Sequence, residues 1–220
     1  VCGSPAMVDG TLEALDAVLR ASAVQKYDAV LVLGDLVGYG ADPNAVVERI
    51  RALNPVAAVR GNHDKVAAGL DTADDFNPMA RAAANWTRNA LTKAALDYLR
   101  ELPAGPALVD TGIEICHGSP LDEDLYVVAD ADAALAIASA RRPLCLFGHT
   151  HIAICSKMDA LRRLTMETAQ GRPEHHVLLE PGAKYLVNPG SVGQPRDGDA
   201  RAAYAKAYAA FHQYQPGTNL

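Results

Sequence analysis

The amino-acid sequence predicts an α/β fold built on two β-sheets. In the first half of the 220 residues, short apolar runs alternate with helical patterns, which is typical of a parallel sheet with crossover helices. After Pro103 the apolar runs are short and the turns frequent, which indicates a second sheet stacked against the first. Polar clusters follow several apolar runs directly, and in α/β sheets ligands bind at the carboxyl ends of strands.

The first half supplies most of the predicted helices. Leu12, Leu15, Val18 and Leu19 recur at helical spacing, and Pro43 suits the first turn of a helix. A buried parallel strand reads as a short apolar run that stops at polar residues. On these grounds we expect helices at 11–24, 43–53 and 77–101, the last with a break near Leu91–Thr92, and strands within 28–35 and 54–64, the second ending in a polar loop.

The second half is predicted to be richer in strands. Its apolar runs are short and separated by glycine and proline, and a helix at 131–140 interrupts them. We expect residues 170–176 to form a loop and no clear element after Ala210. The predicted strands lie within 106–110, 112–120, 143–151, 152–159, 176–182 and 184–193.

Length, charge and cysteine content indicate which classes of protein this sequence can belong to. The chain suits one domain over residues 1–220. The net charge of −6 and the scattered Lys and Arg residues disfavour a nucleic-acid partner, and no apolar run approaches the ~20 residues that span a membrane. None of the four cysteines forms a CxxC pair, so we expect buried reduced thiols and a cytoplasmic location.

Five polar clusters after apolar runs carry the chemistry. Each alone has a structural explanation, because Asp caps helices and Asn, Pro and Gly form turns. As an ordered set they supply carboxylate, amide and imidazole ligands, which suit Mn, Fe or Zn ions, and two such ions can clamp a phosphoryl group. One carboxylate must then bridge the ions. The clusters are Asp35, Asn62-His63-Asp64, His117, His149 with His151, and Asn188.

The ordered motifs GDLVGYG, GNHD, CHG, GHTH and NPGSVGQPRDGD resemble those of the calcineurin-like metallophosphoesterases, with the small bacterial and archaeal phosphodiesterases nearest. The resemblance runs from about Leu12 to about Tyr204. It implies a four-layer α/β/β/α sandwich and two divalent metal ions (Mn, Fe, Zn or Ni). It also implies hydrolysis of phosphodiester or phosphomonoester bonds of small substrates by a metal-bound hydroxide.

The resemblance implies a role for each site residue. Asp35 would bridge both metals, and His63 would be the general acid, oriented by Asp64. The second metal site would add Asn62, His117 and His149, and the first would add His151. By the same resemblance, Asn188 and Ser191 would hydrogen-bond near the metals. From the residues themselves, Arg196 either pairs with a substrate phosphate or lies on a surface turn, and Tyr39 and Arg60 either line the pocket or pack. The substrate contacts are thus expected from Arg196, Tyr39 and Asn188.

Both ends of the chain depart from the family pattern. The family opens with a strand and Asp-x-His, where this chain has Met7 and Asp9. Asp9 is either a metal ligand or a helix N-cap, so we expect the first metal site to be weak or empty. The stretch VCGSPA is a poor strand sequence, and the last strands look eroded, so both termini are expected to be atypical or truncated.

Other functions remain as alternatives. The altered first motif also suits a catalytically impaired binding or scaffold protein of the same fold. A nuclease is disfavoured by the acidic charge, and a protein Ser/Thr phosphatase by the lack of an arginine-bearing signature. The expected partner is a small phosphoester, without nucleic acid or membrane.

Overall fold

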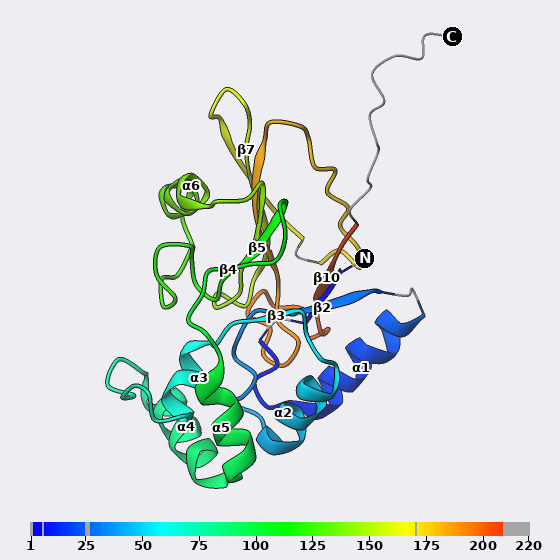
Figure 1. Cartoon of the computed structure of the whole chain (residues 1–220). Helices are drawn as coiled ribbons and strands as arrows, with labels where there is room; N and C mark the ends of the chain where they lie inside the picture. Colours follow the sequence, from blue (N-terminus) through cyan, green and yellow to red (C-terminus); the bar gives the residue numbers. More distant parts are fainter. Residues whose placement is uncertain (1, 6, 25–26, 170, 209–220) are drawn as a thin grey trace.

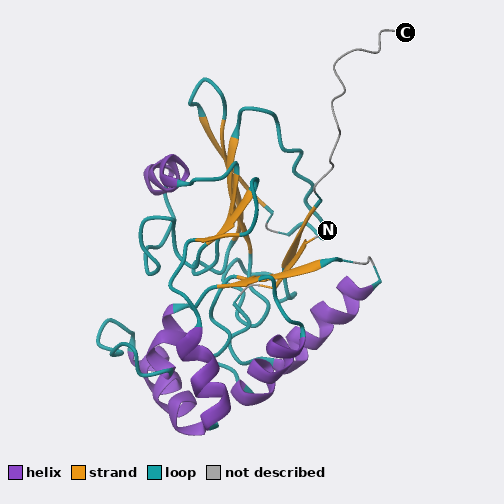
Figure 2. Cartoon of the chain, viewed as in Figure 1, coloured by secondary structure: helices purple, strands orange, loops and turns teal. Residues whose placement is uncertain are grey.

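The computed structural model describes residues 2–5, 7–24, 27–169 and 171–208, which form two β-sheets flanked by helices (Figures 1 and 2). The first sheet has the order β10-β1-β2-β3. Strand β1 pairs in parallel with β2, β2 pairs in parallel with β3, and β10 is antiparallel to β1. The bounds are β1 Cys2–Pro5, β2 Ala29–Val32, β3 Ala57–Ala58 and β10 Tyr204–Ala207.

The second sheet has the order β4-β5-β6-β9-β7-β8. Its centre is parallel, because β5 pairs with β6 and β6 with β9 in the same direction. The outer pairs are antiparallel, so the sheet is mixed. The bounds are β4 Ala107–Leu108, β5 Ile113–Ile115, β6 Leu144–Leu146, β7 Ala153–Met158, β8 Leu164–Thr168 and β9 Lys184–Pro189.

Five of the six described helices follow the predicted pattern closely. The expected break falls at Leu91 and Thr92, where the Thr92 hydroxyl accepts a hydrogen bond from the Ala95 N–H (3.3 Å) and caps the second helix. Pro43 occupies a first-turn position, as predicted. The bounds are α1 Leu12–Ala23, α2 Pro43–Ala52, α3 Asn62–Ala67, α4 Pro78–Ala90, α5 Lys93–Glu101 and α6 Asp130–Ser139.

Three apolar clusters hold these elements together. One joins the first sheet to α1, α2 and α5, a second joins the two sheets, and a third joins the second sheet to α6. Figure 1 shows α1 and α2 beside the first sheet and α6 beside the second. The predicted α/β class with two sheets is confirmed, whereas the four-layer order stays a prediction, which these clusters support.

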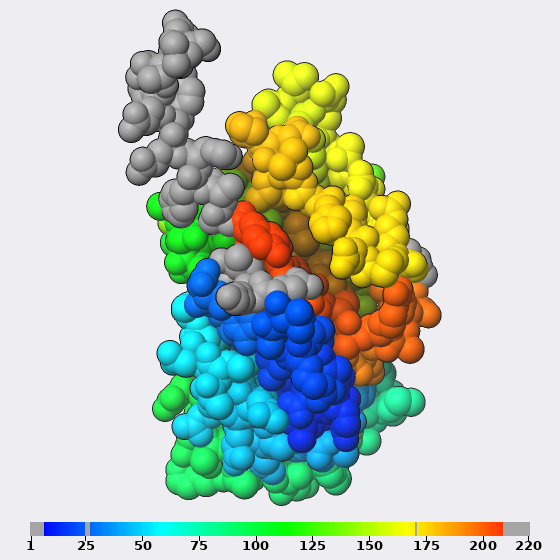
Figure 3. Space-filling view, turned by 90° about the vertical axis from the view of Figure 1, so that its right-hand side faces the viewer, coloured from blue at the N-terminus to red at the C-terminus, as the bar shows by residue number. Residues whose placement is uncertain are grey.

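The two ends of the described chain meet in one sheet. Strand β1 lies between β2 and β10, with Cys2 opposite Ala207. On the face shown in Figure 3, the red-orange strand β10 lies between the blue N-terminal part and the yellow-to-orange residues of the second half. VCGSPA is a poor strand sequence, but its residues Cys2–Pro5 form β1, which pairs with a neighbouring strand on both sides, so the expectation drawn from the sequence was wrong.

Three further local expectations were wrong. Residues 176–182 form no strand, and Leu178 is 87% exposed there. Strand β8, which we did not expect, forms by pairing with β7. The GNHD motif is not a polar loop, because α3 begins at Asn62 directly after Gly61.

The membrane and cysteine expectations concern the described residues. No described helix is long and apolar enough to cross a membrane. Cys116, Cys145 and Cys155 are buried free thiols, as predicted. The cytoplasmic location stays a prediction.

Candidate metal centre and active site

The backbone is strained where the polar clusters lie. Asp9, Asp35, His149 and His151 have φ values of 55°, 49°, 64° and 59°, in the left-handed region that non-glycine residues seldom adopt. They make up four of the seven described non-glycine residues with positive φ. Such strain concentrates at functional sites, where the surrounding structure over-determines it. The four residues are therefore held in place by their surroundings rather than by local preference.

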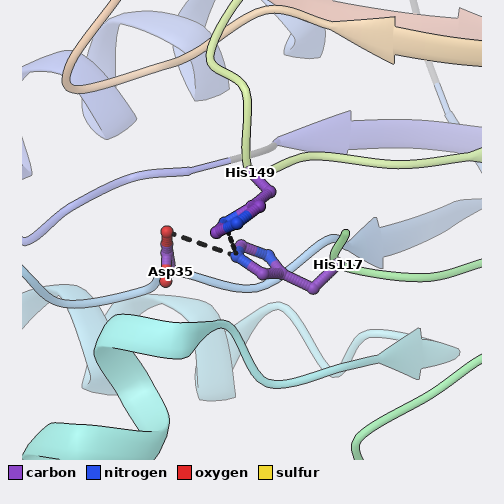
Figure 4. Close-up of side chains that lie close together, drawn as sticks. All are labelled: Asp35, His117 and His149. Carbon is purple, nitrogen blue, oxygen red and sulfur yellow. Dashed lines mark hydrogen bonds and ion pairs between the residues drawn. The ribbon is translucent and has the colours of Figure 1, made fainter. Parts of the chain in front are cut away.

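Two buried side chains and the partly buried Asn62 surround the Nε2 atom of His117. That atom lies 3.4 Å from Oδ2 of Asp35, 3.1 Å from Nδ1 of His149 and 3.3 Å from Oδ1 of Asn62. Figure 4 shows Asp35 and both imidazoles pointing toward one another. Asp35 follows β2, His117 follows β5 and His149 follows β6, so the two sheets supply this group together.

Backbone carbonyls fix the orientation of the three imidazoles. Nδ1 of His117 donates to the Leu33 carbonyl (2.8 Å), Nε2 of His149 to that of Asp124 (3.0 Å) and Nδ1 of His151 to that of Gln194 (2.7 Å). In each neutral ring the other nitrogen then carries a lone pair. Metal-binding histidines are commonly held in this way, so all three rings present a ligand atom to the site.

A second group shares Asp35 with the first. Asp9, Asp35 and His151 bring their ligand atoms within 4.8 Å of one another. Oδ2 of Asp35 lies 3.8 Å from Nε2 of His151, and Oδ2 of Asp9 lies 3.7 Å from Nδ1 of the same ring. Asp35 therefore stands between the two groups, which is the position that a bridging carboxylate requires.

The side chains present fit bound cations. Both carboxylate oxygens of Asp9 and Oδ2 of Asp35 are buried with no hydrogen-bond partner among the described residues, and buried polar groups are otherwise nearly always satisfied. Oδ2 of Asp35 faces Nε2 of both His117 and His151, and when these rings are neutral each of these nitrogens carries a lone pair, so no donor lies between them. A divalent cation in each group would satisfy these atoms.

Burial and neighbouring charges set the ionisation of the two carboxylates in opposite directions. Burial, reinforced by Asp35, raises the pKa of Asp9 well above its usual value. Burial also opposes the ionisation of Asp35, but the nearby imidazoles, His117 above all, hold its pKa well below the usual range. Burial and His117 lower the pKa of His149 to about 3, which keeps that ring neutral and available as a ligand.

His63 lies beside the second-site ligands between two aromatic rings. Its ring centroid is 4.7 Å from those of Tyr39 and Phe76, and its Nδ1 atom is buried without a hydrogen-bond partner in the described part of the chain. Burial lowers the pKa of this ring, with Asp35 opposing the shift. The ring is thus held firmly and carries an uncommitted nitrogen.

The expectation that Asp64 orients the His63 ring needs correction. Oδ1 of Asp64 accepts the backbone N–H groups of Leu36 (2.9 Å) and Val37 (3.1 Å), and Oδ2 accepts that of Gly61 (2.9 Å). No hydrogen bond joins this carboxylate to His63 within the described residues. Asp64 instead fixes the backbone on both sides of the site, between the turn after β2 and the start of α3.

A cavity of about 570 Å³ opens over this centre. Its lining includes Asn62, His63 and His149, together with the predicted substrate residues Tyr39 and Arg196. The volume is of the size that holds a small-molecule ligand. The centre is therefore accessible from one side, at the second group and His63.

Comparison with known proteins agrees with this geometry. The calcineurin-like phosphoesterase superfamily domain matches residues 10–209. The chain belongs to this superfamily. It is 33% identical over 202 residues to an uncharacterised protein of Methanocaldococcus jannaschii, covering 90% of this chain and 78% of that one.

Two solved structures share the superfamily fold with this chain. A metallophosphoesterase from Sphaerobacter thermophilus is 38% identical with a TM-score of 0.78, covering 92% of this chain and 81% of that one. A hypothetical protein from Pyrococcus horikoshii is 19% identical with a TM-score of 0.66, covering 88% and 78%. The calcineurin-like fold is thereby confirmed, and membership indicates a hydrolase.

Within this phosphoesterase fold, Asn188 does not line the cavity. Its amide nitrogen donates to the Gly148 carbonyl (2.6 Å) and the Thr150 hydroxyl (2.7 Å), and its oxygen accepts the Gly190 N–H (2.9 Å). These bonds hold the turn that carries His149, in agreement with the hydrogen bonding expected of Asn188 near the metals, and its contact with substrate stays a prediction. Ser191 likewise donates to the Met7 carbonyl (3.0 Å), beside Asp9.

Met7 has no place among the ligands of this superfamily member. Its side chain is fully buried and belongs to the apolar cluster between the two sheets. Asp9, two residues later, is buried beside His151 and accepts no side-chain cap bond from α1. The structure therefore favours the ligand interpretation of Asp9 over the N-cap interpretation.

Sequence reasoning missed several residues around the site. Phe76 and Tyr126 line the cavity, and the Tyr126 ring lies 3.8 Å from that of His149. Both stand in loops without a motif, so no sequence signal pointed to them. Arg60 forms an ion pair with Glu123 (2.8 Å) and is not among the lining residues, which favours packing over pocket lining.

Proposed function

We propose that this chain hydrolyses phosphodiester or phosphomonoester bonds of small molecules with the help of two divalent metal ions. The observation that carries the proposal is the pair of buried ligand groups that share Asp35 beneath an open cavity. Unsatisfied acceptors of this kind are costly unless a cation binds them. The arrangement therefore supports metal-assisted phosphoryl chemistry.

Each group would hold one ion. Asp35, Asn62, His117 and His149 would bind one, and Asp9, Asp35 and His151 the other. Two ions bound in this way polarise a phosphoryl oxygen and make water a better nucleophile at neutral pH. The carbonyls that anchor the imidazoles keep the ligand atoms directed at the ions.

The side chains on the cavity wall would handle the substrate. His63 lies on the wall between Tyr39 and Phe76 and would donate a proton to the leaving oxygen. The exposed Arg196 guanidinium can pair with phosphate oxygens. The cavity volume supports a small phosphoester rather than a nucleic acid, and the acidic charge of the chain supports the same choice.

The decisive experiment is hydrolysis of a chromogenic phosphodiester and a chromogenic phosphomonoester with manganese, and then with a chelator. We expect turnover that the chelator abolishes and that His63→Gln lowers about 10²–10⁴-fold, the usual effect of a general acid. His176→Gln is the matched control, because His176 is 90% exposed and lies outside the cavity lining.

The alternative is a catalytically impaired binding or scaffold protein. The residues that motivate it are Met7, which lies in the core, and Asp9, which would serve a metal site predicted to be weak or empty. Folded chain that has bound metal and hydrolyses neither substrate would favour this alternative over the enzyme.

A further inference from the structure

The two ligand groups differ in the chemistry of their donor atoms. The first combines the carboxylates of Asp9 and Asp35 with one imidazole, that of His151. The second combines the imidazoles of His117 and His149 with the shared Asp35. We call the first the oxygen-rich group and the second the nitrogen-rich group. They meet at one side chain but offer different ligand sets.

In the oxygen-rich group the free atoms are mainly carboxylate oxygens. Both oxygens of Asp9 and Oδ2 of Asp35 are buried, and no described residue forms a hydrogen bond with them. His151 contributes only Nε2, because its Nδ1 donates to the Gln194 carbonyl at 2.7 Å. Met7, two residues before Asp9, packs in the apolar cluster between the sheets. Three oxygens and one nitrogen are therefore available there.

In the nitrogen-rich group two ring nitrogens converge. Nε2 of His117 and Nδ1 of His149 lie 3.1 Å apart, and the amide oxygen of Asn62 lies 3.3 Å from the former. The other ring nitrogen of each histidine donates a hydrogen bond to a backbone carbonyl, so the lone pairs of Nε2 of His117 and Nδ1 of His149 stay directed at one point. This group therefore offers two nitrogens with one neutral and one charged oxygen.

Metal ions distinguish such ligand sets. Carboxylate oxygen suits Mg²⁺ and Mn²⁺, whereas imidazole suits Zn²⁺, Fe²⁺ and Ni²⁺. Affinity rises from Mn²⁺ to Zn²⁺ at most protein sites, so the difference between the groups lies in how strongly each prefers Zn²⁺ over Mn²⁺. That preference should be strong where imidazoles dominate and weak where carboxylates dominate.

We propose that the chain is a mixed-metal protein, with a Zn²⁺-type ion in the nitrogen-rich group and Mn²⁺ in the oxygen-rich group. This inference rests on the proposed function for the presence of two ions. It concerns which ion each group selects, and it is measured without any substrate.

The first measurement supplies the metal-free full chain with one equivalent each of Zn²⁺ and Mn²⁺. After desalting, elemental analysis should find one of each per chain. Electron paramagnetic resonance should show an isolated Mn²⁺ ion, whereas chain loaded with Mn²⁺ alone should show the signal of a coupled pair.

Variants at Asp9 assign the ions to the groups. Asp9→Asn should weaken Mn²⁺ binding at least about tenfold, since even changes to residues behind a ligand have effects of that size, and should leave one Zn²⁺ per chain. Asp9→His adds a second imidazole and should let the chain take two Zn²⁺ ions from the same mixture. Asn and His both tolerate the φ of 55° at this position, so the fold should persist, as thermal melting will check.

The outcomes separate this inference from the proposed function. Two Zn²⁺ ions and no Mn²⁺ in the unmodified chain, or equal loss of both ions in Asp9→Asn, would overturn the inference whether or not the chain hydrolyses phosphoesters. One ion of each kind without any turnover would uphold the inference and reject the proposed function. The control His176→Asn should behave as the unmodified chain does.

Discussion

At the scale of single residues, Asp64 joins two segments through its carboxylate. The Asp64 side chain is fully buried and accepts hydrogen bonds from three backbone N–H groups, those of Leu36, Val37 and Gly61. A buried N–H group left unsatisfied costs about 1–3 kcal/mol. We therefore expect Asp64→Ala to lower the free energy of unfolding by about 3 kcal/mol or more, measured by urea denaturation.

The control for this prediction is Asp97→Ala. Asp97 forms an ion pair with Lys93 on the surface of α5, where the lysine is 86% exposed. Exposed pairs of this kind contribute about 0.3–0.5 kcal/mol. If the two variants lost the same small amount of stability, the N–H groups around Asp64 would have found other acceptors.

Cys155 offers a prediction about reactivity and pH. Burial raises the pKa of its thiol to about 11, whereas an unfolded cysteine ionises near 8.5. Since the thiolate is the reactive form, we expect alkylation of Cys155 at pH 8 to be at least about 100-fold slower in folded than in urea-unfolded chain. Peptide mapping by mass spectrometry would separate the alkylation of Cys155 from that of the other thiols. Equal alkylation rates of Cys155 in the folded and unfolded chain would contradict the prediction.

The same pKa difference has a consequence for stability. Between about pH 8.5 and 11 the unfolded thiol loses its proton while the folded one keeps it. The contribution of this group to stability is therefore complete below that window and is lost as pH rises through it. In the Cys155→Ala variant, the part of the decrease in unfolding free energy between about pH 8.5 and 11 that this thiol causes should be absent.

At the scale of elements, strand β9 holds the turn between β6 and β7 in place through side-chain hydrogen bonds. Asn188, in β9, binds Gly148 and Thr150 on either side of His149. Residues that hold a metal ligand in place typically affect metal affinity 10–100-fold. We expect Asn188→Ala to weaken Zn²⁺ binding by about this factor, measured by competition with a chromogenic chelator. Asn89→Ala, on the exposed side of α4, should leave it unchanged.

Helices with clear apolar periodicity or a capping residue could be predicted from the sequence. Strands that form only because a neighbouring strand pairs with them could not. The helices at Leu12–Ala23 and Pro43–Ala52 follow apolar spacing, and the break before α5 follows from Thr92. Strands β1 and β8 are set by their neighbours in the sheet. The apolar run at 177–179 pairs with no strand of the described chain and forms an exposed loop.

Part of the candidate site could likewise be predicted from the sequence and part could not. Asp35, His117 and His149 follow buried strands, and their position after an apolar run is visible in the sequence. The direction of a side chain is not visible there, so the hydrogen-bond partners of Asp64 and Asn188 could not be named from the sequence. Their partners come from segments far away in the chain, so only the fold determines them.

At the scale of the whole molecule, the ligand groups lie where the two sheets meet. Asp9, Asp35 and Asn62 follow strands of the first sheet, whereas His117 and the His149–His151 turn follow strands of the second. Each group contains side chains from both sheets. Bound cations would therefore tie the sheets together in addition to the apolar cluster between them.

This placement predicts that metal stabilises the fold. A ligand that binds only the folded state at 100 times its dissociation constant adds about 2.7 kcal/mol, which for a chain of this size raises the melting temperature by about 5–10 °C. We expect such a rise when Mn²⁺ or Zn²⁺ is added to chelator-treated chain in a scanning fluorimetry or calorimetry experiment. Asp35→Asn should lose most of it, because Asp35 is the side chain that both groups share, whereas His176→Ala should keep it. A melting temperature that did not respond to either ion would mean that the unsatisfied carboxylates of Asp9 and Asp35 are not metal ligands.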